Sequence, residues 1–228
     1  MERPEGYPKI SVLICTLNEE KNLPHVLPKI PGWVDEVILV DGHSTDNTAE
    51  VAKQLRPNIR VLQQPSKGKG DALKYGVQQA TGDIIVTLDA DGETSPEDIP
   101  RFIEPLLKGY DFAKGSRLVH GKPPRMPRHR WFGNKVLAIT FSLLYSAKYT
   151  DICSGYNAFW KSAWLKVRLT YDGFHMDQQL LARLHKAGLN IVEVSHASQG
   201  RLAGISKVSG IKQGFVDWVL IIRERFHD

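Results

Sequence analysis

The stretch Asp83–Glu93, DIIVTLDADGE, decides the expected fold of this chain. Its first six residues are a nearly continuous apolar run of strand length, which is typical of a strand buried on both faces of a sheet. Asp89 and Asp91 follow at once, so two carboxylates leave the strand end together. Mg²⁺ and Mn²⁺ prefer such oxygen ligands, and Glu93 adds a third carboxylate. The stretch therefore predicts a central strand that ends at a metal site formed by Asp89, Asp91 and Glu93.

Strands and helices alternate on either side of this strand. The patterns predict further strands at Ile10–Thr16, Glu36–Val40, Arg60–Gln63 and Asp111–Ser116, and helices at Asn22–Ile30, Thr45–Leu55, Asp71–Ala80 and Pro96–Leu107. Such alternation is typical of a mainly parallel α/β sheet with helices on both faces. A length of 228 residues fits one domain of this kind, and no linker divides the chain.

The second half of the chain is less regular. We expect loops at 117–131 and 196–208, a strand within Asp151–Trp160 and another at Ile191–Val194, and helices at Phe132–Tyr149, Asp177–Ala187 and Ile211–Arg225.

Polar residues follow three of the predicted strands, at Thr16–Glu19, Asp41–Ser44 and Asp89–Asp91. Ligands of parallel sheets bind at the carboxyl ends of the strands, so this edge is the expected site. Asp41 has two interpretations, a hydrogen-bond acceptor for a base or ribose and a cap for the helix that follows. Lys67–Gly70 also has two, a phosphate-binding turn and an ordinary surface turn.

Charge is unevenly distributed. Residues 114–135 hold seven lysines and arginines and no acid, whereas residues 83–111 are rich in acids. This pairing indicates a site for metal and phosphates, and the alternative is two solvated faces of opposite sign. Cys15 and Cys153 are too few for a disulfide framework or a zinc site and suit a reducing cytosol. Residues 1–9 lack the apolar core of a signal peptide, so we expect a soluble or peripheral protein.

Three sequence blocks together resemble the family 2 glycosyltransferases of the GT-A fold. They are SVLICTLNEEKNL, VDEVILVDGHSTDNT and KGKGDALKYGVQQATGDIIVTLDADGE, and the similarity covers roughly residues 9–117. The second half resembles dolichyl- or polyprenyl-phosphate hexose synthases in GSRL (115–118), RHRWFGN (128–134) and TDICSGYNAFWKSAW (150–164), and more loosely in RLAGISKVSG (201–210).

The resemblance implies a nucleotide-sugar-binding half at residues 1–117 and an acceptor-binding half at residues 118–228. It implies that the nucleotide sugar is bound by Thr16, Asn18, Glu19, Val40, Asp41, Lys69, Asp89, Ala90, Asp91, Arg117, Arg201 and Lys207. Asp89, Asp91 and Glu93 then hold Mg²⁺ or Mn²⁺. Many family members have Glu-Asp at the start of a late helix, and here only Asp177 carries over. The implied catalytic residues are therefore Asp177 and Asp91.

The acceptor decides the role of Asp177. A hydroxyl acceptor must lose its proton, which makes Asp177 the candidate base. A lipid phosphate is already ionised at neutral pH, since its second pKa is near ~6, and needs cations instead. Arg125, Arg128 and Arg130 are the expected acceptor-binding cations. With such an acceptor, Asp177 is equally well interpreted as a helix cap.

We expect an inverting transfer of a hexose, from a donor of the GDP-mannose or UDP-glucose type, to a polyprenyl or dolichyl phosphate. The alternative is a soluble or glycan hydroxyl acceptor. Helices Phe132–Tyr149 and Ile211–Arg225 are amphipathic, and we expect them to contact a membrane, although core packing is the commoner use of such a pattern. The chain would then be cytoplasmic and peripheral on the cytosolic membrane face.

Two other protein classes fit less well. A nucleotidyltransferase needs a Gly-rich basic loop directly after the first strand, and TLNEEKN is not one. A basic module that binds nucleic acid or membrane leaves the strand-end carboxylates unexplained, because they repel phosphate.

Overall fold

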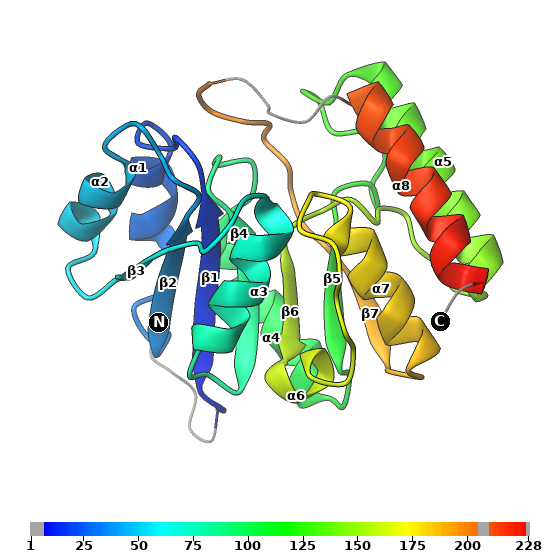
Figure 1. The fold of residues 1–228 in the computed structure, drawn as a ribbon, viewed down its shortest axis with the longest axis horizontal. Coiled ribbons are helices and arrows are strands. Elements are labelled where there is room, and N and C mark those ends of the chain that lie inside the picture. Colours follow the sequence, from blue (N-terminus) through cyan, green and yellow to red (C-terminus); the bar gives the residue numbers. More distant parts are fainter. Residues whose placement is uncertain (1–6, 205–209, 227–228) are drawn as a thin grey trace.

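The computed structural model describes residues 7–204 and 210–226 of the chain. This part contains one seven-stranded sheet with the strand order β3-β2-β1-β4-β6-β5-β7 (Figure 1). The strands are β1 (Ile10–Thr16), β2 (Glu36–Asp41), β3 (Arg60–Gln63), β4 (Ile84–Asp89), β5 (Phe112–Ser116), β6 (Asn157–Trp160) and β7 (Ile191–Ser195). The predicted α/β class is confirmed, with the GT-A arrangement of a mostly parallel sheet between helices.

The register of the central strands brings the predicted polar ends together. β1 pairs in parallel with both β2 and β4, and Thr16 lies opposite Asp41 while Cys15 lies opposite Asp89. Three strand ends therefore meet at one edge of the sheet, as the sequence pattern predicts.

β6 departs from the parallel arrangement, because it runs antiparallel to both β4 and β5. β5 ends at the carboxyl edge of the sheet, and helix α5 (Arg128–Tyr145) follows it on that side. The chain then re-enters the sheet from the same edge, so β6 has to run in the opposite direction.

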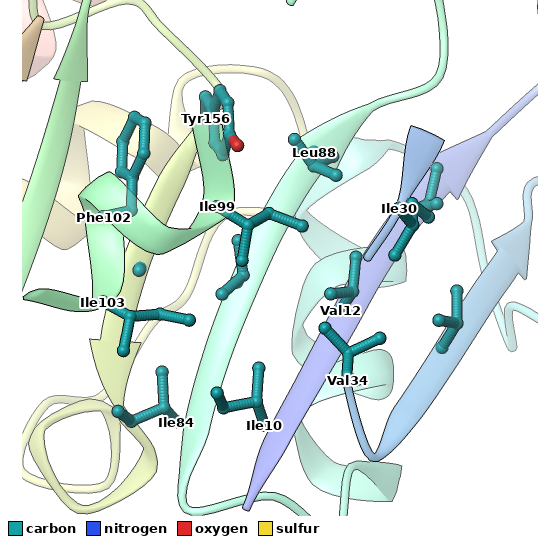
Figure 2. Close-up of a cluster of buried hydrophobic side chains, with 14 of the residues drawn as sticks. Ile10, Val12, Ile30, Val34, Ile84, Leu88, Ile99, Phe102, Ile103 and Tyr156 are labelled. Atoms are coloured by element: carbon teal, nitrogen blue, oxygen red, sulfur yellow. The ribbon is translucent and has the colours of Figure 1, made fainter. Parts of the chain in front are cut away.

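Helices cover both faces of the sheet. One face packs against α1 (Leu23–Val26), α2 (Thr48–Leu55), α4 (Ile99–Leu107) and the short 3-10 turns η1 (Leu27–Lys29) and η2 (Pro96–Asp98). Figure 2 shows this core, in which Ile99 of α4 lies over β4, and Phe102 and Ile103 lie toward β6. The Phe102 ring stacks on Tyr156 with ring centres 4.0 Å apart. The opposite face packs against α3 (Lys69–Gln79), α6 (Lys161–Trp164) and α7 (Met176–Lys186).

Two long helices stand at one side of the molecule. α5 and α8 (Gly210–Phe226) lie side by side, and Leu137, Phe141 and Ile221 pack with residues of α7 into a third apolar cluster (Figure 1). Core packing is therefore part of their role. In the described part of the chain, no helix combines the length and the apolar character needed to cross a membrane.

The observed helix bounds correct several predictions. α5 begins at Arg128, within the predicted 117–131 loop, because Pro127 adopts the extended N-cap conformation. α2 begins at Thr48 because Asp46 accepts hydrogen bonds from the backbone and hydroxyl of that residue. The predicted helix at Asn22–Ile30 is only one turn of α-helix followed by a 3-10 turn, and Pro24 and Pro28 lie in its two parts.

Candidate functional site

A cavity of about 980 Å³ opens at the carboxyl edge of the sheet. The ends of β1 and β4 line one part of it, and residues of α5, α7 and α8 line another. Most of the predicted site residues share this cavity, namely Thr16, Glu19, Lys69, Asp89, Ala90, Asp91, Glu93, Arg117, Arg130, Asp177 and Arg201.

Of the predicted site residues that the structure describes, five do not line this cavity: Asn18, Val40, Asp41, Arg125 and Arg128. Lys207 lies outside the described residues. Val40 is fully buried, and its carbonyl accepts a long hydrogen bond from Thr16 Oγ1 at 3.4 Å.

Asn18 and Asp41 fix the loops that follow β1 and β2. Asn18 has a left-handed backbone with φ of 56°, and its Oδ1 accepts from the Thr45 backbone N–H at 2.7 Å. Asp41 accepts from the Ser44 N–H at 2.9 Å and from the Ser44 hydroxyl at 2.5 Å. Both side chains thus accept hydrogen bonds that hold these loops in place, and their contact with a nucleoside stays a prediction.

Asp89, the last residue of β4, pairs with a buried lysine. Lys69 Nζ donates to Asp89 Oδ1 at 2.7 Å and lies 3.7 Å from Asp177 Oδ2. Burial opposes ionisation of Asp89, but Lys69 overcomes this effect and lowers the pKa of the carboxyl. Gly155 leaves the necessary room, because a Cβ there would collide with Asp89 and lie 2.5 Å from Lys69 Nζ.

Asp91 carries the least compensated charge of the strand-end acids. Burial, followed by repulsion from Asp89, raises the pKa of Asp91 to about 6. Its Oδ1 accepts from the Glu93 backbone N–H at 2.9 Å, and Arg201 Nη1 lies 3.6 Å from its Oδ2. Among the described residues, no three acidic, histidine or cysteine side chains already form a metal cluster.

Glu93 and Arg117 belong to a buried ion-pair network. Arg117 donates to both carboxylate oxygens of Asp151, from Nε at 2.7 Å and from Nη2 at 3.2 Å. Its Nη1 lies 3.5 Å from Glu93 Oε1, which also accepts from Ser198 Oγ at 2.7 Å. Although burial opposes ionisation, Arg117 holds the pKa of Asp151 well below its usual range. Arg117 therefore faces the cavity already paired, with Asp151 setting its orientation.

The loop that contains Arg201 and Leu202 packs against the residues that follow β1 and β4. Arg201 Nη2 donates to both oxygens of Glu19, at 2.6 and 2.7 Å, and Glu19 also accepts from Asn22 Nδ2 at 2.6 Å. The Leu202 N–H donates to the Asp91 carbonyl at 3.1 Å. Glu19 thus anchors the loop that carries Arg201, a structural role that the sequence pattern did not predict.

Asp177 lies in the first turn of α7, and its side chain is buried beside Lys69. The N-cap residue of α7 is His175, so the interpretation of Asp177 as the cap does not match the structure. Asp177 lines the cavity.

Three buried polar residues of the cavity were missed by sequence analysis, namely Asn134 of α5, Gln178 of α7 and Asp217 of α8. Within the described part of the chain, Asn134 Nδ2 and Gln178 Oε1 have no hydrogen-bond partner. One signal was readable for Asp217, which is a single acid within the apolar run GFVDWVLII. Asn134 and Gln178 carry no comparable signal, because only packing turns them inward.

Asp217 is expected to cost stability at neutral pH. Burial, with a smaller effect of Asp177, raises the pKa of Asp217 from 3.8 to about 6. A carboxyl with a raised folded-state pKa binds protons more tightly in the folded chain, so stability falls as pH rises from about 4 to about 6. We expect Asp217→Asn to increase the free energy of unfolding by about 1–3 kcal/mol above pH 7, and by much less near pH 4.

Urea denaturation of both proteins between pH 4 and 8 measures this difference. Glu50→Gln, at an exposed acid of α2, is the matched control and should change little. The prediction would be contradicted if the free energy of unfolding changed with pH in the same way for Asp217→Asn and for the unchanged chain.

Comparisons with known proteins agree with this geometry. Residues 11–167 match the model of the family described as glycosyl transferase family 2. A glycosyltransferase named AglJ from Haloferax volcanii is 30% identical over 190 residues, covering 81% of this chain and 61% of the relative. The dolichol-phosphate mannosyltransferase of Pyrococcus furiosus is 33% identical over 213 residues, covering 89% of this chain and 60% of the relative. The chain thus spans about three fifths of the length of these two relatives.

A solved structure shares the fold. It is the glucosyl-3-phosphoglycerate synthase of Mycobacterium tuberculosis in complex with Mn²⁺, uridine diphosphate and phosphoglyceric acid, with a TM-score of 0.71 and 23% identity. The similarity covers 95% of this chain and 77% of that one. The sequence match and the shared fold agree, and the chain belongs to glycosyl transferase family 2.

Proposed function

We propose that this glycosyltransferase moves a hexose from a nucleoside-diphosphate sugar to a polyprenyl-type lipid phosphate, with inversion at the anomeric carbon. The observation that carries the proposal is the change of character along one cavity. Carboxylates at the end of β4 line one part of it, and Phe132, Val136, Phe215 and Trp218 of α5 and α8 line another. A charged donor and an apolar acceptor chain need such a combination. The P. furiosus relative is itself a dolichol-phosphate mannosyltransferase.

The donor end has residues that fit a divalent metal. Burial, followed by repulsion from Asp89, raises the pKa of Asp91, and a bound cation would favour its charged form. Asp89, Asp91 and Glu93 would hold Mg²⁺ or Mn²⁺, which supplies charge stabilisation for the departing diphosphate. The M. tuberculosis structure contains Mn²⁺ and uridine diphosphate.

The other donor contacts come from the chain's own cations and polar groups. In this proposal Lys69, Arg117, Arg201 and Lys207 bind the phosphates, while Thr16, Asn18, Glu19, Val40, Asp41 and Ala90 surround the nucleoside. Lys69, Arg117 and Arg201 are each already paired with a carboxylate. Their positions are thereby fixed before the donor binds, which reduces the cost of ordering them.

The part of the cavity that we assign to the lipid phosphate has two hydrogen-bonding side chains on one face of α5. Arg130 and Asn134 lie one turn apart on α5 and both line the cavity. The Arg130 guanidinium suits the oxygens of a phosphate, and the buried Asn134 Nδ2, which has no partner among the described residues, is a further donor on this face. Arg125 and Arg128 are exposed outside the cavity and would contact lipid headgroups instead.

The transfer is a single displacement. An acceptor phosphate oxygen attacks the anomeric carbon, the bond from this carbon to the diphosphate oxygen breaks, and the nucleoside diphosphate leaves with the electron pair. The attacking oxygen is already anionic at neutral pH, so no base has to remove a proton. Asp177 then acts chiefly by holding Lys69 beside Asp89.

A hydroxyl acceptor is the second candidate, and the burial of Asp177 in the cavity wall favours it. The M. tuberculosis structure is a complex with phosphoglyceric acid, which is a soluble molecule. In that case Asp177 would take the hydroxyl proton.

The assay that tests the proposal incubates the protein with UDP- and GDP-hexoses and Mg²⁺ or Mn²⁺. It is run with short polyprenyl phosphates and, separately, with phosphoglyceric acid. We expect glycolipid formation with the polyprenyl phosphate. Transfer to the soluble acceptor alone would replace the proposal by its alternative.

Membrane contact should depend on the outer apolar residues of α5 and α8. Ile139, Leu143 and Phe226 are exposed, Leu143 by 78%, and do not line the cavity. Burying a leucine in an apolar phase contributes about 1.5–3 kcal/mol. We expect Leu143→Glu combined with Phe226→Glu to weaken binding to anionic vesicles at least about tenfold, as measured by vesicle sedimentation.

Leu165→Glu is the matched control, because Leu165 of the turn after α6 is equally exposed at 73% but lies away from both helices. Equal vesicle binding by the double variant and this control would remove the membrane role of α5 and α8. With such binding, the chain would act as a peripheral protein on the cytosolic membrane face.

A further inference from the structure

Gln178 lines the cavity and carries a buried hydrogen-bond acceptor. The residue follows Asp177 in α7 and is only 3% exposed. Its Nε2 donates to Cys153 Sγ at 3.7 Å, and its Oε1 has no partner among the described residues. A buried polar atom without a partner costs about 1–3 kcal/mol, so its retention calls for a ligand that donates to it.

Asp217 presents a second acceptor from a different helix. It is 5% exposed, lines the same cavity, and accepts from Gln213 Nε2 at 2.7 Å through Oδ1. It makes no ion pair with any cation of the described residues. Gln178 and Asp217 both line this cavity, and the helices that carry them, α7 and α8, are in contact with each other.

The chemistry of this pair selects its ligand. An amide oxygen and a carboxylate both need hydrogen-bond donors, and a phosphate dianion has none and would be repelled by Asp217. Sugar hydroxyls donate readily, and a neutral ring carries no charge that Asp217 would repel. The surrounding wall is built from helices α7 and α8, which hold the two groups more rigidly than loops would.

The position of the pair fits the sugar of the donor. Gln178 adjoins Asp177, whose carboxylate lies 3.7 Å from Lys69, and Lys69 in turn bonds to Asp89. A hexose on a diphosphate bound at the strand edge therefore extends toward α7. We propose that Gln178 and Asp217 form a subsite for the hydroxyls of the transferred hexose and determine which hexose is accepted. This inference rests on the proposed hexosyl transfer.

The burial of Asp217 at the cavity supports a functional role. The residue joins no structural ion pair within the described residues, and its burial disfavours the charged form. An acid that strains the fold while facing a cavity is typical of a binding site.

The test compares UDP-glucose and GDP-mannose with analogues that lack one hydroxyl each. For the unchanged protein we expect at least one deoxy position to lower kcat/KM by about 10–100-fold, since a buried acceptor then stays unpaired. In Gln178→Met and Asp217→Asn, removing the same hydroxyl should lower kcat/KM by less than about threefold. The affinity for UDP or GDP alone, measured by calorimetry, should change less than twofold. Gln78→Met, at an exposed glutamine of α3, is the matched control and should show the same loss as the unchanged protein.

Three results would overturn the inference. The loss of kcat/KM with the deoxy analogue could be as large in both variants as in the unchanged protein. The variants could instead raise KM only for the polyprenyl phosphate, which would assign the groups to the acceptor. The unchanged protein could bind the nucleotide sugars no more tightly than UDP or GDP. By contrast, sugar-dependent affinity without transfer to any acceptor would overturn only the proposed function.

Discussion

Replacing Asp91 with alanine is expected to reduce hexose transfer by about a thousandfold or more while the fold persists. Asp91 follows β4 and carries charge that its neighbours compensate only in part. Charge stabilisation by a metal at a leaving group is worth several kcal/mol, and each ~1.4 kcal/mol changes the rate tenfold. Removal of metal with EDTA should have the same effect and should be reversed by added Mn²⁺.

Steady-state transfer kinetics and thermal unfolding measure the two halves of this prediction. Glu97→Ala is the control, since Glu97 is an exposed acid of the same acidic segment and lies outside the cavity. Full activity in the metal-free protein, or a normal rate in Asp91→Ala, would exclude a metal-dependent reaction at this edge.

The second large effect separates the two acceptor classes. With a lipid phosphate, Arg130→Glu is expected to lower kcat/KM for the acceptor by about 10²–10³-fold, because a charged hydrogen bond is lost and a repulsion is added. Asp177→Asn should then cost less than about tenfold. A hydroxyl acceptor reverses the order, since losing a general base costs ~10²–10⁴ in rate. Arg128→Glu should affect turnover less than Arg130→Glu, because only Arg130 lines the cavity.

All three variants are assayed with short polyprenyl phosphate and with a hydroxyl acceptor, beside Arg168→Glu as an exposed control. Near-normal turnover in Arg130→Glu together with a large loss in Asp177→Asn would refute the lipid-phosphate assignment.

The fold was predictable where burial on two faces leaves a continuous apolar run. β1 and β3 have the predicted bounds, and β4 differs by one residue at each end. The four residues of β6 have no such run of their own, and the direction of that strand depends on where α5 returns the chain. The start of α5 was mistaken for a loop because proline and arginine dominate its surroundings, whereas Pro127 in fact begins the helix.

The site was predictable to the level of the strand edge. Parallel register brings the ends of β1, β2 and β4 together whatever the side chains are, which explains why most predicted residues share one cavity. The direction of each side chain depends on the local turn, and the left-handed backbone of Asn18 turns that residue toward Thr45 instead. Asn134 and Gln178 come from helices whose relative rotation is set by packing, so no local pattern marks them, whereas Asp217 is marked only as a single acid in an apolar run.

Gly155 has a consequence for protein engineering. Any side chain at this position would separate Lys69 from Asp89, because a Cβ occupies the space that their charged groups fill. A mutagenesis library that aims to broaden the range of accepted sugars should therefore keep glycine at 155 and diversify 178 and 217. Variants recovered from such a library would retain the donor-binding charges while the wall that faces the sugar changes.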